Sequence, residues 1–293
     1  MFGCELWDGL NSTEKLMLER MQRFCAKLIQ KLNPRTRSDV CCGMLGLISV
    51  ESYIDKAKLN FLRRLAVLPG TAHSKCVFLL RLFQYLLLQP QNESFCSEIV
   101  KILHKVDLYE LFDSIFLKSG LFPDKLPWKK MVINRLKELE VKAFNDRTDG
   151  DNDFKRFKAV HQDIHKPNKL WYFARANPNK LKQCETVAKY IAESVNIDSV
   201  YLCEFCGRLY YDKLTHFSTV CSATEDIQST FWNLVVNNYP VEVSVCLSNL
   251  NNEEFVETLL GANSHVSLDD KVYNELYTLF IEFIQRLHNE VVL

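Results

Sequence analysis

Residues 201–221 read YLCEFCGRLYYDKLTHFSTVC, and this stretch decides the fold of the chain around it. It contains three cysteines and one histidine at the spacing C-x2-C-x9-H-x4-C, namely Cys203, Cys206, His216 and Cys221. Three thiolates and one imidazole form a common structural zinc shell, in which a C-x2-C turn aims two sulfurs at one point. Because four protein donors leave no position for water, such a shell is structural rather than catalytic. We therefore predict one structural zinc ion at these four residues.

The side chains of this segment have two interpretations. The chain has 11 cysteines in all, so the donors could instead be small core residues that are merely close in sequence. Aromatic rings near a zinc knuckle can stack on nucleic-acid bases, or they can pack the knuckle onto a neighbouring helix. We favour packing for Phe205, Leu209 and Phe217, and we leave Tyr210 and Tyr211 open between the two roles.

The rest of the chain is expected to be mostly α-helical. It has 293 residues, of which only 9 are glycine and 8 are proline. Few chain breakers and many helix formers favour helices, and short strands are expected at about 199–222 alone. The polar stretch 145–153 is predicted to be a linker or an exposed loop. Apolar residues at helical spacing predict helices at about 13–32, 50–67, 74–88, 93–104, 107–118, 128–144, 154–163, 182–194, 224–238, 252–260 and 267–289.

The first and last of these helices have the clearest signals. Asn11 and Glu14 have the spacing of a reciprocal cap at the start of the first helix. The apolar positions of that helix form one stripe, which comprises Met17, Met21, Phe24, Cys25, Leu28 and Leu32. Its basic positions lie beside or opposite the stripe and are Arg20, Arg23, Lys27 and Lys31. The last helix has apolar residues on two faces, so we expect it to be buried on both sides.

Charge is distributed unevenly along a chain whose net charge is zero. Residues 1–117 have a balance of +3, residues 118–190 of +8 and residues 191–293 of −11. A basic middle segment is typical of a protein with an anionic partner. The same pattern also fits solvated helix faces on which the acidic end packs. Basic and aromatic residues alternate within this segment, and the basic ones assigned to nucleic acid are Lys155, Arg156 and Lys158. In the alternative interpretation, these three residues are solvated side chains of a helical hairpin that has an aromatic core.

Several classes of protein are not expected from this sequence. No apolar run is long enough for a membrane span, and the start lacks the features of a signal peptide. We therefore expect an intracellular protein, nuclear or cytoplasmic, with reduced cysteines. No glycine-rich phosphate loop, nucleophile elbow or paired-aspartate motif is present, so neither an enzyme nor a small-molecule substrate is expected. His161 and His165 have the spacing of a metal pair but lack a third ligand, and we interpret them as a polar helix surface.

Two stretches of the chain together resemble one known family. Their segments are ERMQRF (19–24), TRSDV (36–40), GMLGLISV (43–50), KLNFLRRL (58–65), the cysteine–histidine segment, Phe231-Trp232 and Leu259-Leu260-Gly261. This order resembles the region that follows the polymerase core in non-LTR (LINE-type) retrotransposon reverse transcriptases. In that family a long basic helix begins a helical thumb-like domain, and a zinc knuckle follows near the C-terminus. The palm with its paired catalytic aspartates is absent from this chain.

The resemblance implies a zinc-containing, nucleic-acid-binding remnant of such a reverse transcriptase, without polymerase activity of its own. It implies a thumb-like helical region at 1–120, a basic helical middle segment at 121–195, and the knuckle with C-terminal helices at 196–293. In the family, the basic face of the first helix would face the template–primer duplex. In this chain, lysines and arginines would contact phosphates, the knuckle would hold single-stranded RNA or DNA, and no membrane is involved. The alternative function is a helical protein-interaction module whose zinc is purely structural. The acidic end and the neutral total charge favour that alternative.

Overall fold

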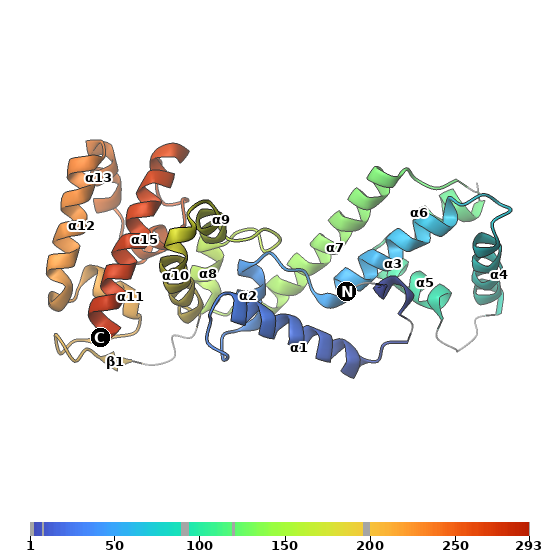
Figure 1. Ribbon diagram of the computed structural model, residues 1–293, viewed down its shortest axis with the longest axis horizontal. Helices are drawn as coiled ribbons and strands as arrows, with labels where there is room; N and C mark the ends of the chain where they lie inside the picture. Colours follow the sequence, from blue (N-terminus) through green and yellow to red (C-terminus); the bar gives the residue numbers. More distant parts are fainter. Residues whose placement is uncertain (1–2, 8, 89–93, 119–120, 196–199, 293) are drawn as a thin grey trace. The chain divides into compact units, whose positions relative to one another are not determined.

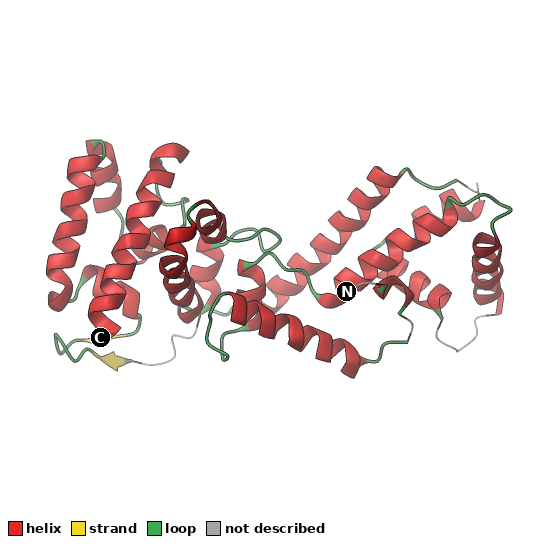
Figure 2. Cartoon of the chain, viewed as in Figure 1, coloured by secondary structure: helices red, strands yellow, loops and turns green. Residues whose placement is uncertain are grey.

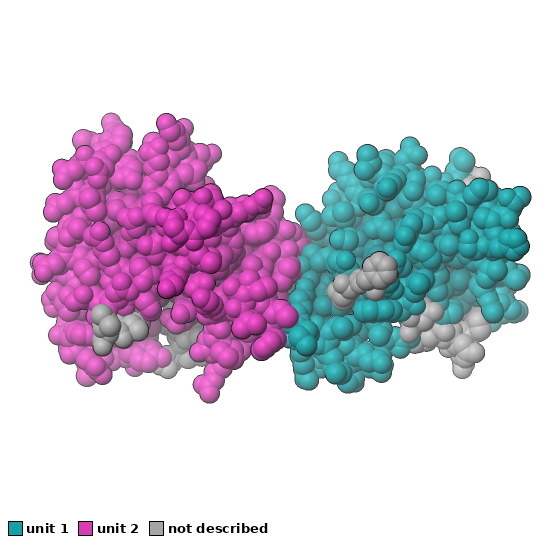
Figure 3. All heavy atoms as spheres, in the orientation of Figure 1, with its two compact units in different colours: residues 1–22, 48–147 teal, residues 23–47, 148–293 magenta. Residues whose placement is uncertain are grey.

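The computed structural model describes residues 3–7, 9–88, 94–118, 121–195 and 200–292, and within them the fold is mostly α. Figure 2 shows helices throughout these residues and strands in one short hairpin. The predicted fold class is therefore confirmed. The chain forms two compact units, which Figure 3 distinguishes by colour. Unit 1 comprises residues 1–22 and 48–147, and unit 2 comprises residues 23–47 and 148–293. The three sequence segments described above stay a prediction.

Each unit has its own set of helices, and α1 (Ser12–Ile29) belongs in part to each. The elements of unit 1 are η1 (Cys4–Leu6), α3 (Val50–Ala66), α4 (His73–Leu88), α5 (Phe95–Lys105), α6 (Tyr109–Phe112), the π-helical η2 (Asp113–Leu117) and nearly all of α7 (Lys125–Thr148). The helices of unit 2 are α2 (Ser38–Met44), α8 (Phe154–Val160), α9 (Lys169–Ala176), η3 (Pro178–Lys180), α10 (Leu181–Glu193), α11 (Lys213–Thr219), η4 (Ser222–Thr224), α12 (Glu225–Asn238), α13 (Val241–Ser248), α14 (Asn252–Leu260) and α15 (Asp270–Val292). The strands of unit 2 are β1 (Tyr201–Leu202) and β2 (Leu209–Tyr210).

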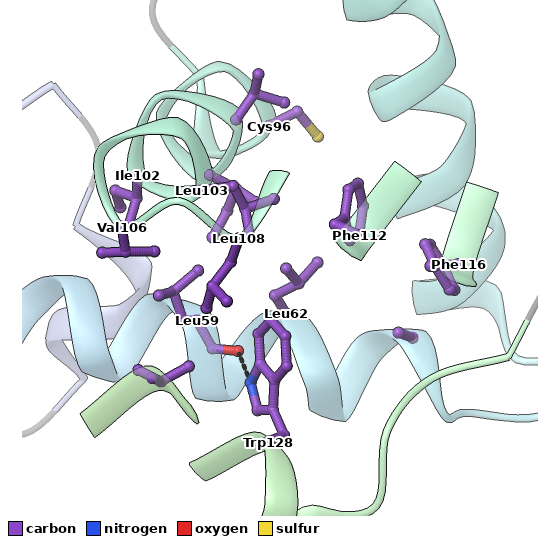
Figure 4. Close-up of a cluster of buried hydrophobic side chains, with 14 of the residues drawn as sticks. Leu59, Leu62, Cys96, Ile102, Leu103, Val106, Leu108, Phe112, Phe116 and Trp128 are labelled. Carbon is purple, nitrogen blue, oxygen red and sulfur yellow. Dashed lines mark hydrogen bonds between the residues drawn. The ribbon is translucent and has the colours of Figure 1, made fainter. Parts of the chain in front are cut away.

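Unit 1 is built around an apolar core, part of which is drawn in Figure 4. Trp128 of α7 is fully buried, and its indole Nε1 donates a hydrogen bond to the Leu59 carbonyl at 3.0 Å. That bond satisfies the one polar atom which this large side chain brings into the core. Phe122 packs edge-on against Trp128 at a centroid distance of 4.8 Å, and Phe112 and Phe116 extend the aromatic group. Helices α3 and α7 are thus joined by both apolar and polar contact.

The core of unit 2 is centred on α15, which packs against α10, α12 and α14 (Figure 1). The prediction that this helix is buried on both sides is confirmed by five side chains that are at most 2% exposed, Tyr273, Leu276, Tyr277, Phe280 and Ile284. Gly261 ends α14 with a φ of +117°, and a Cβ atom on it would lie 3.3 Å from the Tyr277 hydroxyl oxygen. The left-handed conformation and the close approach both favour glycine there.

A second glycine lets the end of α2 approach residues 161–168 closely. Gly46 has a φ of +66°, and a Cβ atom on it would lie 2.6 Å from the carbonyl carbon of Lys166. The Asn168 N–H donates to the Met44 carbonyl at 2.8 Å beside this contact. A side chain at position 46 would therefore push the two segments apart.

The predicted polar helix surface at His161 and His165 is wrong. Helix α8 ends at Val160, and His161 is buried with its Nε2 2.8 Å from the Gly43 carbonyl oxygen. Pro167 follows shortly after, and the residue before a proline is disfavoured in a helix. The two imidazoles therefore do not share a helix face, and His161 supports the packing of α2.

Helix α1 has the predicted cap but not a buried stripe. The Asn11 and Glu14 N–H groups each donate to the other residue's side chain at 2.9 Å. Four members of the apolar stripe are more than 60% exposed, namely Met17, Met21, Phe24 and Leu28, while Leu32 is buried. The side of α1 that contacts the protein carries Leu18, Gln22 and Ala26, and Gln30 continues this side just after the helix. Glutamine amides that reach backbone carbonyls hold this face together with the packed side chains of Leu18 and Ala26.

Candidate metal centre

The first two predicted metal ligands lie in the turn of the β-hairpin. Strands β1 and β2 are antiparallel, with Tyr201 opposite Tyr210. The Cys203 N–H donates to the Arg208 carbonyl at 2.9 Å, and the Gly207 N–H donates to the Cys203 carbonyl at 2.8 Å. Gly207 has a φ of +69°, which glycine adopts without steric cost. This tight turn places the sulfurs of Cys203 and Cys206 on one side of the hairpin.

The other two ligands come from α11 and the residues just after it. Asp212 caps α11 by accepting hydrogen bonds from the Leu214 and Thr215 N–H groups. His216 lies in the last turn of this helix, and the Cys221 N–H donates to its carbonyl at 2.9 Å. The chain thus turns back after α11 and brings Cys221 next to His216.

All four predicted ligands meet in one cluster. One donor atom of each lies within 4.8 Å of the others, so a single metal ion could be held by all four. The Sγ atoms of Cys203 and Cys221 are 3.8 Å apart, and Cys206 Sγ is 3.4 Å from His216 Nε2. Cys203, His216 and Cys221 are buried, while Cys206 is partly exposed. A ring stack supports the imidazole, because Tyr210 lies parallel to it at a centroid distance of 4.7 Å.

Burial shapes the acid–base behaviour of this cluster. It raises the pKa of the Cys221 thiol to about 11 and lowers the pKa of His216. Both shifts favour the neutral form of the group, whereas at the Cys203 thiol burial is opposed by hydrogen bonds from the Cys206 and Phe205 backbone, which lower its pKa. A bound cation would reverse the shift of the Cys221 thiol, because thiolates rather than thiols are metal ligands.

The side chains around the cluster differ from the sequence interpretation. Phe217 is 4% exposed, which confirms its packing role. Packing was the wrong assignment for Phe205 and Leu209, since they are 58% and 70% exposed. A hairpin of two-residue strands cannot cover residues on its outer side, so they face solvent. We call the exposed apolar and aromatic residues of this segment the hairpin surface, and they are Tyr201, Leu202, Phe205, Leu209 and Tyr211.

The basic residues of α1 that were assigned to nucleic acid have different surroundings. Arg20 is exposed and Arg23 is partly buried. The Lys27 ammonium donates to the Pro34 carbonyl at 2.7 Å, and Lys31 forms an ion pair with Glu185 at 3.0 Å. Arg20 and Lys31 are thus the two exposed members of this set.

The basic residues of α8 are largely engaged within unit 2. Arg156 is buried, and its guanidinium donates to Asp212 at 2.6 Å and to the Thr215 hydroxyl at 3.3 Å. It therefore braces the cap of α11. Lys158 pairs with Asp149 at 2.7 Å, and Lys155 pairs with Glu253 at 3.5 Å.

Three residues that hold the cluster in place were not identified from the sequence. Asp212 was missed although an acidic residue just before an apolar helix is a cap signal. Thr224 and Gln228 donate hydrogen bonds to the Phe217 and Cys221 carbonyls, and they fix the turn that follows the cluster. Hydrogen bonds of this kind depend on the folded backbone and have no sequence signal of their own.

Comparison of the chain with protein-family models, with curated proteins and with solved structures finds no match. Among the described helices, none is both long and apolar enough to cross a membrane. The resemblance to retrotransposon reverse transcriptases therefore rests on the quoted residues and stays a prediction.

Proposed function

We propose that Cys203, Cys206, His216 and Cys221 hold one structural zinc ion. Two sulfurs bound tetrahedrally to zinc at about 2.3 Å would lie about 3.8 Å apart, and a sulfur and an imidazole nitrogen about 3.5 Å apart. The corresponding distances here are 3.8 Å and 3.4 Å. Three thiolates favour zinc over the hard cations magnesium and calcium. With four protein donors and no open position, the ion joins the hairpin to α11 and does no chemistry itself.

The function of the chain, on this proposal, is to bind single-stranded RNA or DNA as a remnant of a retrotransposon reverse transcriptase without polymerase activity. The observation that carries it is the exposure of three aromatic rings on the hairpin surface, Tyr201, Phe205 and Tyr211. Exposed rings stack on any base, whereas a duplex hides its base faces. Arg208 lies between these rings in sequence and is exposed, so it can contact a phosphate.

Base stacking can be tested with two single variants. We expect Phe205→Ala and Tyr211→Ala each to weaken binding of a labelled single-stranded oligonucleotide by about 1–3 kcal/mol in fluorescence anisotropy. Because few cations surround the hairpin, the affinity should fall only gently as salt rises. Tyr172→Ala is the matched control, because Tyr172 is 52% exposed on α9 and lies outside the hairpin surface. Failure of the wild-type protein to bind the oligonucleotide at low salt would reject this function.

A second candidate is a protein-interaction module with a purely structural zinc ion. It is favoured by the charge of residues 200–213, where Glu204 and Asp212 balance Arg208 and Lys213. A neutral, apolar surface suits a protein partner better than a phosphate backbone. Binding of a purified protein partner distinguishes the two candidates. If the second candidate is right, this binding persists after nuclease treatment and its affinity falls in Leu209→Ser.

A further inference from the structure

Lys169 is the first residue of α9, a helix that packs against α15 within unit 2. The ring of Phe173 on α9 lies edge-on to Tyr277 of α15 at a centroid distance of 5.8 Å. Beside this contact, the Lys169 Nζ atom lies 3.9 Å from the ring centroid of Tyr273 and 5.2 Å from that of Tyr277. The lysine is half-buried, so its amine lies among aromatic rings and can still be reached from solvent.

This position is a poor one for a positive charge. The rings attract an ammonium group, but they replace none of the three strong hydrogen bonds that it makes in water. Among the residues that the structure describes, no oxygen atom lies within hydrogen-bond or ion-pair distance of Lys169 Nζ. Lys169 also begins a helix, and the dipole at a helix N-terminus disfavours a cation.

The acid–base balance of Lys169 is set by its burial and by one carboxylate. Burial lowers the pKa of the ammonium to about 8, and the carboxylate of Asp270 at the start of α15 opposes that shift. Of the described charged groups, Asp270 is the one whose charge shifts this pKa. Burial raises the pKa of the Tyr273 and Tyr277 hydroxyls, so both rings stay neutral where the amine titrates. Lys169 therefore has far more unprotonated amine near neutral pH than an ordinary lysine, whose pKa is about 10.4.

We propose that Lys169 is a nucleophilic amine that small acyl thioesters acylate. A desolvated lysine is an activated nucleophile. The unprotonated Nζ attacks the thioester carbonyl carbon, so that an N–C bond forms and the C–S bond breaks. The thiolate leaves and takes up the proton that the nitrogen loses, and no oxidant or reductant is needed. The product is a neutral amide, which no longer places a charge beside the rings.

The modification goes beyond the proposed function, because Lys169 belongs neither to the metal cluster nor to the hairpin surface. Acetylation of the whole chain by N,S-diacetylcysteamine, a small neutral thioester, tests it. Peptide mapping by mass spectrometry measures the rate at each lysine, after hydroxylamine has removed acetyl groups from cysteines. At neutral pH we expect Lys169 to react about tenfold faster than the exposed Lys142 of α7, because more of its amine is unprotonated. Its rate should level off above about pH 8, where the amine is fully unprotonated.

Two variants separate activation of the amine from simple accessibility. Asp270→Asn removes the carboxylate that favours the ammonium, so the pH of half-maximal rate should fall and Lys169 should react faster at neutral pH. Asp269→Asn is the matched control, because Asp269 is equally exposed but its side chain accepts the Lys271 N–H at 2.8 Å. The control should have the half-maximal pH of the wild-type protein.

Three results would overturn the proposal. The first is a rate at Lys169 that is no higher than the rate at Lys142 in the wild-type protein. The second is a rate that keeps rising up to about pH 10, as for an ordinary lysine. The third is a half-maximal pH that is unchanged or raised in Asp270→Asn. Circular dichroism of both variants, expected to match the wild-type protein, separates a changed amine from a lost fold.

Discussion

The core of unit 1 and the metal centre of unit 2 represent opposite ways to hold a protein segment in place. In unit 1, residues distant in sequence such as Leu59, Leu103 and Trp128 are fully buried against one another. At the metal centre, four donor atoms meet in a small cluster, while the hairpin beside them leaves Leu202 and Leu209 more than 60% exposed. The hairpin thus buries little apolar surface of its own.

The two regions differ in how their stability is distributed over contacts. An apolar core distributes it over many contacts, so each truncation costs a part of the total. A short hairpin with exposed side chains has no such reserve, and small elements of this kind usually need a metal ion or a disulfide. Loss of one metal donor should therefore unfold the whole hairpin but leave unit 1 intact. Truncation of one core side chain should lower the stability of unit 1 only in part.

The largest effect is expected from loss of a donor atom. Cys203→Ser should reduce the zinc content from one ion per chain to none, measured by inductively coupled plasma mass spectrometry. Zinc binding contributes about 10–16 kcal/mol in zinc-finger peptides, so the hairpin should lose its fold with the ion. Hydrogen exchange should then become fast in residues 200–221 and stay unchanged in unit 1.

The matched control for this change is Cys246→Ser. Cys246 is only partly buried on α13 and is not one of the donors. It should retain zinc and slow exchange in the hairpin. Zinc that survives in Cys203→Ser, or a wild-type protein that contains none when purified without chelators, would contradict the assignment.

The next largest effect is expected at Trp128. Trp128→Ala removes a fully buried ring and its hydrogen bond to Leu59, which should lower the free energy of unfolding of unit 1 by about 3–5 kcal/mol. Chemical denaturation measures that loss, and the zinc content should not change. Leu126→Ala is the control on the same helix, because Leu126 is 77% exposed. A variant that loses zinc as well would show that the two regions are not held independently.

These two regions also differ in how far they could be predicted from the sequence. The metal centre is a local pattern, so the spacing of Cys203, Cys206, His216 and Cys221 identified the cluster that the structure brings together. The reciprocal cap of Asn11 and Glu14 is local in the same way and is confirmed. Sequence patterns that span only a few residues can be recognised without knowledge of the tertiary fold.

Properties that depend on contacts between residues distant in sequence could not be predicted from the sequence. Both units combine segments from separate parts of the sequence, and no local signal predicts that combination. The apolar stripe of α1 is exposed because Gln22 and Gln30 form the contacting side, which periodicity alone does not reveal. The short helices α2, α9 and α13 were not predicted, since one or two turns give too few apolar positions for a clear period.

A smaller effect than that of Trp128 is expected from the ion pair behind the metal centre. Asp212→Asn preserves a capping oxygen for α11 but leaves the buried Arg156 guanidinium without its carboxylate. We expect a loss of about 2 kcal/mol in the unfolding free energy of unit 2, measured by chemical denaturation, because the unpaired charge stays buried. Zinc should remain bound, but a competing chelator should remove it faster. Lys155→Gln, which breaks only an exposed pair with Glu253, is the control and should change neither quantity.

The smallest effect is a dependence of unit 2 on pH through His161. Burial lowers the pKa of this imidazole below its usual 6.5, so the folded state resists a proton that the unfolded state accepts. Unit 2 should therefore have its full stability above about pH 6.5 and lose part of it as the pH falls below that value. Acid also protonates the thiolates of the metal centre, so the test is the difference between the wild-type protein and His161→Gln in denaturation midpoints from pH 7.5 to 5.5. The variant should have the flatter pH dependence, because glutamine does not titrate and can still donate to the Gly43 carbonyl. If the two pH profiles are parallel, His161 does not contribute to the acid sensitivity of unit 2.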